Sequence, residues 1–66
     1  MKATYNRTDD VIMLEISSAP IDHAEEVGPF IVHFSPDNKL VLVEILDASE
    51  FLGRVAQAEE GKTIEL

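Results

Sequence analysis

The chain has 66 residues, no cysteine, and 13 acidic against 5 basic side chains, which gives a formal net charge of −8. A chain of this length is expected to form a single domain, residues 1–66, with a marginal core. Without cysteine it has no disulfide and no thiolate metal site to stabilise that core. Self-association is therefore the expected source of additional stability, and we predict a homodimer.

The charge and hydropathy of the chain also exclude some partners. Nucleic acids and anionic membranes attract Lys and Arg, so an acidic chain is not expected to bind either. No apolar run approaches the ~18 residues of a membrane span, and residues 1–10 lack the apolar segment of a signal peptide. We expect a soluble, cytoplasmic protein.

The first half of the chain predicts three extended segments. Residues 2–5 form a short strand, and residues 6–10 are turn formers rich in Asn and Asp. Residues 11–16 alternate apolar side chains with the period of a strand. Residues 21–27 carry charge and few good strand formers, which is typical of an edge strand or an extended connection.

The most apolar part of the chain predicts a β-hairpin of residues 30–34 and 40–45, closed by a loop that begins with Pro36. Its register follows from the alternation of side chains, because a slip of one residue would mix the two faces. On one face the expected pairs are Phe34–Val41, Val32–Val43 and Phe30–Ile45; on the other they are His33–Leu42 and Ile31–Glu44.

A helix is expected directly after this hairpin. Asp47 has the position of an N-cap and Glu50 that of its capping-box partner. Gly53 either ends a short helix or interrupts a longer one, and Gly61 is expected to close it. Residues 53–66 are thus either an extension of the helix or a flexible tail.

These elements predict an α+β fold, a small antiparallel β-meander of about four strands followed by a short C-terminal helix. One short helix can cover one face of the sheet, which leaves the other face as an apolar patch, and such patches usually mark an interface. We expect this patch to carry the interaction residues Met13, Ile31, His33, Leu42, Glu44 and Leu46.

The order of several motifs resembles a known family. The motifs are Tyr5-Asn6, Asp10-Val11-Ile12-Met13-Leu14, Glu26-Val27-Gly28-Pro29 and Glu44-Ile45-Leu46-Asp47-Ala48-Ser49. They resemble the small prokaryotic domain-of-unknown-function family twenty-two eighty-three over residues 4–52. Asn6 and Met13 depart from its pattern, which has Asp and Tyr there. The resemblance implies a compact sheet-plus-helix domain and no particular chemistry, and some members resemble partners in toxin–antitoxin-like gene pairs.

Few residues suggest catalysis or metal binding. His23 and His33 are the only imidazoles, and with Glu25 or Glu44 they do not have the spacing of a metal motif. The serines lie in no nucleophile elbow, and there is no glycine-rich phosphate loop. We therefore expect no enzyme, no metal and no cofactor.

The sequence favours a non-enzymatic protein-interaction module, a homodimer whose acidic surface or exposed strand edge binds a protein. A small basic partner fits the charge, and antitoxin-like neutralisation would be one instance. The alternative is a small-ligand or metal-binding domain with its site at the dimer seam, near His33, Glu44 and Tyr5.

Overall fold

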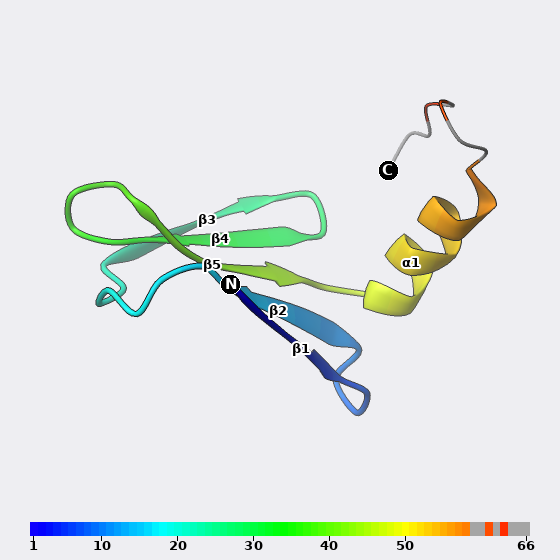
Figure 1. Cartoon of the computed structure of the whole chain (residues 1–66), viewed down its shortest axis with the longest axis horizontal. Coiled ribbons are helices and arrows are strands. Elements are labelled where there is room, and N and C mark those ends of the chain that lie inside the picture. The colour runs from blue at the N-terminus through cyan, green and yellow to red at the C-terminus, as the bar shows by residue number, and fades with distance from the viewer. Residues whose placement is uncertain (59–60, 62, 64–66) are drawn as a thin grey trace.

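A computed structural model describes residues 1–58, 61 and 63, and these residues contain five strands and one helix. In chain order the elements are β1 Lys2–Asn6, β2 Val11–Glu15, β3 His23–Val27, β4 Phe30–Phe34, β5 Leu40–Ile45 and α1 Ala48–Gln57 (Figure 1). The predicted α+β class, with a small antiparallel sheet followed by a C-terminal helix, is confirmed.

The five strands form one sheet in the order β1-β2-β5-β4-β3. β2 pairs with β5, so the connection from β2 to β3 passes the β4–β5 hairpin. It is held there because the Ile16 N–H donates to the Val41 carbonyl at 2.8 Å and the Asp22 N–H donates to the Phe34 carbonyl at 2.8 Å. β3 lies at an edge, as predicted, where its Glu25 and Glu26 side chains stay in water.

The central hairpin has the predicted register along most of its length. Phe30 lies opposite Ile45, and Val32 lies opposite Val43. The prediction that Phe34 faces Val41 is wrong, because Phe34 pairs with Leu40 across a bulge.

The loop explains this bulge. The Ser35 N–H donates to the Lys39 carbonyl at 2.9 Å, and the Lys39 N–H donates to the Ser35 hydroxyl at 3.1 Å. Asn38 between them has a left-handed φ of 62°. This tight closure makes Leu40 the partner of Phe34 and leaves Val41 as the extra residue, whose carbonyl accepts the hydrogen bond from Ile16.

Directly paired residues share a face of the sheet, so the pairing defines two faces. We call one the apolar face; its residues are Ala3, Tyr5, Ile12, Leu14, Phe30, Val32, Phe34, Val43 and Ile45, bordered by His23, Glu25, Val27 and Leu40. We call the other the mixed face; its residues are Thr4, Val11, Met13, Glu15, Glu26, Ile31, His33, Leu42 and Glu44.

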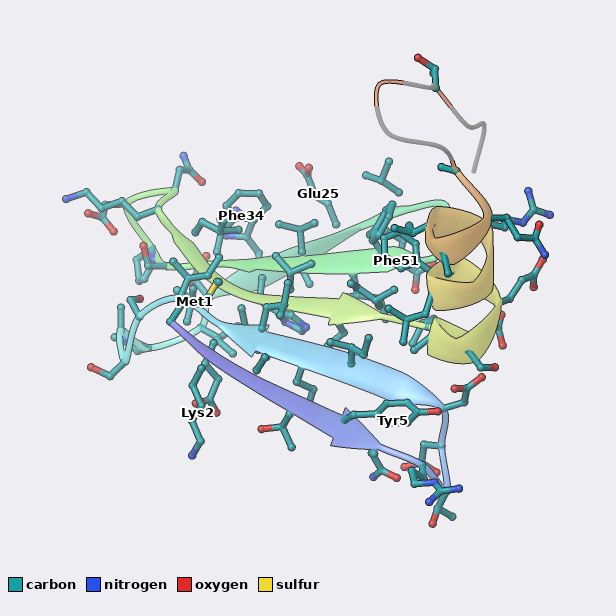
Figure 2. The ribbon with its side chains drawn as sticks, turned by 45° about the vertical axis from the view of Figure 1, so that its right-hand side comes forward. Met1, Lys2, Tyr5, Glu25, Phe34 and Phe51 are labelled. Carbon is teal, nitrogen blue, oxygen red and sulfur yellow. The ribbon has the colours of Figure 1, made fainter. Side chains whose placement is uncertain are left out.

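The helix α1 lies at one end of the sheet and not over a face (Figures 1 and 2). Asp47, with a left-handed φ of 50°, turns the chain sharply after β5. The Phe51 ring meets the Phe30 ring edge-on, with 5.7 Å between centroids. The expectation that the helix covers a whole face is therefore wrong, since it reaches only the end of the apolar face.

The described residues form an incomplete core. The buried apolar residues are Val41, Leu42, Ile45 and Ala48, and no large side chain among the described residues is fully enclosed. The apolar side chains of β2 and β4 are only half-buried. The sheet thus leaves apolar surface in water that a second layer would ordinarily cover.

The helix runs through Gly53 and ends at Gln57, where the Ala58 N–H donates to the Val55 carbonyl at 3.1 Å. The prediction that Gly61 closes the helix is wrong, since the chain is already extended at Ala58. The sequence left open whether residues 53–66 extend the helix or form a flexible tail. Within that range, residues 59–60, 62 and 64–66 lie outside the described residues. Within the described residues, no helix combines the length and the apolar character needed to cross a membrane.

Candidate functional site

The structure brings together five of the six residues that the sequence predicts for interaction. They form two neighbouring rows on the mixed face, because Met13 pairs with Glu44 and Glu44 with Ile31, while His33 pairs with Leu42. Leu42 is buried and the others are half-buried. Their use as an interface stays a prediction.

Leu46 is separated from this group. It follows the end of β5, and its N–H continues the ladder by donating to the Pro29 carbonyl at 2.8 Å. It lines a hollow of about 200 Å3 between the end of the sheet and α1, together with Pro29, Asp47, Glu50, Phe51 and Arg54.

His33 and Glu44 form the one polar pair inside the mixed face. Their Nε2 and Oε1 atoms are 2.6 Å apart, and the two side chains are 18% and 26% exposed. The two residues are diagonal neighbours on β4 and β5, which places an imidazole and a carboxylate within reach. Each group satisfies the other, so neither is left half-buried without a partner.

Tyr5 does not join this pair, because it lies on the apolar face while His33 and Glu44 lie on the mixed face. A single site near all three residues, as the ligand-binding alternative expected, is therefore not assembled within one chain. The described residues also contain no group of three or more His, Cys, Asp or Glu side chains that could hold a metal ion.

A second polar cluster, which the sequence did not predict, lies where β1, β2 and the helix meet. The Asp10 carboxylate accepts hydrogen bonds from the Tyr5 hydroxyl at 2.7 Å and from the Ser49 hydroxyl at 2.7 Å. It also accepts from the Ser49 N–H at 3.0 Å, and the Asp10 carbonyl accepts from the Ala48 N–H at 2.9 Å. Two free N–H groups of the helix start are thereby satisfied by a residue from the β1–β2 turn.

This cluster replaces the predicted capping box. Asp47 occupies the N-cap position, but its side chain makes no capping hydrogen bond within the described part of the chain. Glu50 also departs from the prediction, since its Oε1 atom pairs with Arg54 at 3.2 Å. The left-handed backbone of Asp47 turns the chain at the helix start, and Asp10 from the β1–β2 turn provides the cap instead.

The hydrogen bonds also shift two pKa values. Donation from Tyr5 and then from Ser49 holds the pKa of Asp10 below its ordinary value. The same bond raises the pKa of Tyr5, because loss of the phenolic proton would end the donation and place a second negative charge beside Asp10. The cluster is therefore built around an ionised Asp10.

Tyr5, Asp10 and Ser49 each lie in a motif that carries the family resemblance, which was the only signal for the cluster in the sequence. A strand tyrosine, a turn aspartate and a helix serine do not otherwise indicate that they meet. All three side chains act on the junction of sheet and helix, so we interpret the cluster as a structural one.

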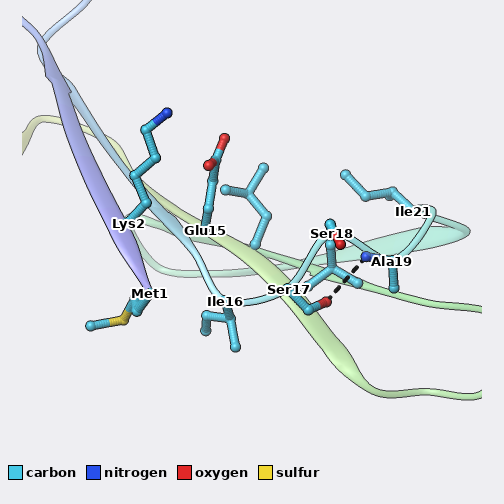
Figure 3. A pocket seen from close by; sticks show the side chains of 10 residues that line it. Met1, Lys2, Glu15, Ile16, Ser17, Ser18, Ala19 and Ile21 are labelled. Atoms are coloured by element: carbon cyan, nitrogen blue, oxygen red, sulfur yellow. Dashed lines mark hydrogen bonds between the residues drawn. The ribbon is translucent and has the colours of Figure 1, made fainter.

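A second hollow lies at the opposite end of β2, beside the connection to β3 (Figure 3). Its volume is about 490 Å3, and it is open to solvent. The Ser17 hydroxyl there accepts a hydrogen bond from the Ala19 N–H at 3.4 Å, which shapes the connection. The lining residues are Met1, Lys2, Glu15, Ile16, Ser17, Ser18, Ala19, Ile21, Val41 and Leu42.

Fold and site together define a small α+β protein, an open antiparallel sheet with its C-terminal helix fastened to one end. A sequence profile described as protein of unknown function (DUF2283) matches residues 2–49, and the chain belongs to this family. The match spans the whole sheet and ends at Ser49, so it includes the Asp10 cluster. No curated protein and no solved structure matches the chain.

Proposed function

We propose that this chain is a non-enzymatic protein-interaction module that acts as a homodimer, with the apolar face of one copy packed on the apolar face of the other. The observation that carries the proposal is the open apolar face. Its residues on β2, β4 and β5 are Ile, Leu, Val and Phe, and the described part of the helix lies at one end of the sheet, where Phe51 meets Phe30.

The chemistry of this face supports a second copy as its occupant. Two twisted sheets can pack face to face with interdigitating apolar side chains. Glu25, at the edge, is the only carboxylate of the face as we define it, so the net charge of −8 does not oppose contact at its centre. A short chain with few buried residues gains most from such a layer.

The acidic surface that stays outside such a dimer supports a second part of the proposal. We propose that it binds a small basic protein, with antitoxin-like neutralisation as one instance, because complementary charge steers and selects partners. The cytoplasmic location expected from the sequence remains part of this proposal. The test is a tagged pull-down at low and high salt with identification by mass spectrometry. One dominant basic partner that is lost as salt rises is the expected result.

Sedimentation equilibrium with a pair of matched variants tests the dimer. Val32→Glu places a charge in the middle of the apolar face. Ile31→Lys places a charge next along β4 on the mixed face, where Glu26 and Glu44 lie directly opposite it and can pair with it. We expect the mass of Val32→Glu to be half that of the wild type and of Ile31→Lys, with far-UV circular dichroism as the check of folding. A monomeric wild type would overturn the proposal. Selective loss of mass in Ile31→Lys would move the interface to the mixed face.

A further inference from the structure

The two edges of the sheet differ in charge. β1 and β3 both leave a row of backbone N–H and C=O groups open to pairing, since within the described part of the chain each has a neighbouring strand on one side only. β3 carries the adjacent carboxylates Glu25 and Glu26, whereas β1, with the sequence Lys-Ala-Thr-Tyr-Asn, carries none. The side chains of β1 are all exposed.

The charges of β3 oppose pairing between two copies of that edge. An antiparallel two-fold pair centred on Glu25 places Glu25 opposite its own copy. Moving the centre by one residue places Glu26 opposite its own copy. Like charges directly opposite one another are destabilising, so the central registers of β3 are all disfavoured.

The side chains of β1 are complementary to their own copies. An antiparallel pair centred on Thr4 places Thr4 opposite Thr4, which is a favourable cross-strand pair. On the apolar face the small Ala3 side chain then lies opposite the large Tyr5 side chain. The Tyr5 hydroxyl is already bound to Asp10, so its ring is held in place before a second strand arrives. At the ends, Lys2 lies opposite Asn6, and no like charges face each other.

We propose that β1 is a self-pairing edge, which joins β1 of a second copy in antiparallel register centred on Thr4. The contact uses the backbone groups of β1 and side chains at the border of the apolar face, but not its centre, so it does not require the face-to-face dimer. Edge pairing extends the sheet across both copies and keeps the two apolar faces on the same side. Together the two contacts give a dimer of dimers, in which two extended sheets pack face to face.

Disulfide trapping tests the register. The chain has no cysteine, so Thr4→Cys introduces a single thiol. At the two-fold centre the Cβ atoms at position 4 of the two copies face each other at ~4.5–5.5 Å, the usual spacing of directly opposite residues. This distance is close to the Cβ–Cβ spacing that a disulfide needs. Glu25→Cys is the matched control at the centre of β3. Within the paired edges each thiol meets the other at an effective concentration in the millimolar range, whereas free chains of the control meet at the micromolar protein concentration. We therefore expect cross-linking of Thr4→Cys to be at least about 100-fold faster than that of the control.

A further variant separates this contact from the face-to-face dimer. Val32→Glu in the Thr4→Cys background is expected to keep fast cross-linking, because β1 does not use the apolar face. If Thr4→Cys cross-links no faster than Glu25→Cys while Val32→Glu still dissociates the wild-type dimer, the edge proposal is overturned and the face-to-face dimer stands. If cross-linking is fast and Val32→Glu leaves the mass unchanged, the edge contact stands and the face-to-face dimer is overturned.

Discussion

On the mixed face, His33 and Glu44 satisfy each other and Leu42 is buried. On the apolar face, Tyr5 and Val27 at its borders are 45% and 60% exposed, and the centre is only half-buried. The difference is chemical. A hydrogen bond between two neighbouring strands can satisfy a polar pair within one sheet, but apolar side chains leave water only when another surface covers them. One layer can therefore satisfy the polar pair of its mixed face by itself, but it leaves most side chains of its apolar face only half-buried.

The largest expected effect comes from truncation of a buried side chain of the apolar face. Ile45 is 7% exposed on the central strand β5, whereas Val27 lies on the same face at the edge. Ile45→Ala should lower the free energy of unfolding by about 3 kcal/mol, because it removes buried methyl groups and leaves a cavity. Val27→Ala should change it by less than about 0.5 kcal/mol. Equal costs in urea denaturation would contradict this contrast between a buried and an exposed position of the apolar face.

A smaller effect is expected on the mixed face. His33→Ala, Glu44→Ala and the double variant form a mutant cycle across the pair with the 2.6 Å contact. We expect a coupling energy of about 1 kcal/mol at neutral pH, typical of a hydrogen bond that is partly shielded from water. A coupling energy of zero in urea denaturation would show that the mixed face does not depend on this pair.

A third prediction tests how Asp10 fastens the start of the helix to the end of the sheet. The pKa of Asp10 is lowered from 3.8 by its hydrogen bonds in the folded chain, so the carboxylate stabilises the fold above that pH. The melting temperature of the wild type should exceed that of Asp10→Asn at neutral pH. This difference should shrink as the pH falls through the lowered pKa. Tyr5→Phe, which removes the largest contribution, should weaken the pH dependence. A difference that stays constant in acid would contradict the assignment.

The smallest effect is expected in the helix itself, away from both faces. A Cβ atom at Gly53 would meet nothing within 4 Å, and the residue is inside α1. Gly53→Ala should raise the free energy of unfolding by about 0.5–1 kcal/mol through helix propensity. Gly28→Ala is the control, since Gly28 has a left-handed φ of 58° and alanine there is strained. A loss of stability in Gly53→Ala would indicate an unrecognised contact of the helix.

The predicted strands and the β4–β5 hairpin were correct because they depend on near neighbours. Alternating side chains set the Phe30–Ile45 and Val32–Val43 pairs, and a turn of few residues joins the two strands. The edge position of β3 followed from its charge, since Glu25 and Glu26 are costly in the middle of a sheet. The family motifs were also present in the sequence, and the profile match agrees with them.

The candidate site was only partly predictable. Alternation placed His33 and Glu44 on the same face, but their diagonal contact depends on the twist and spacing of strands that the sequence does not specify. The Asp10 cluster was missed because Tyr5, Asp10 and Ser49 come from three elements, and Ser49 is 39 residues from Asp10. A local capping rule could only assign the helix start to Asp47 and Glu50.

The sequence alone determined the elements of this protein, the edge position of β3 and the acidic character of the chain, because these depend on local alternation, turn chemistry and composition. The tertiary structure decided the pairing of β2 with β5, the bulge at Val41 and the position of the helix at the end of the sheet. These features depend on hydrogen bonds between residues far apart in the chain, whose energies are only defined once the sheet has formed.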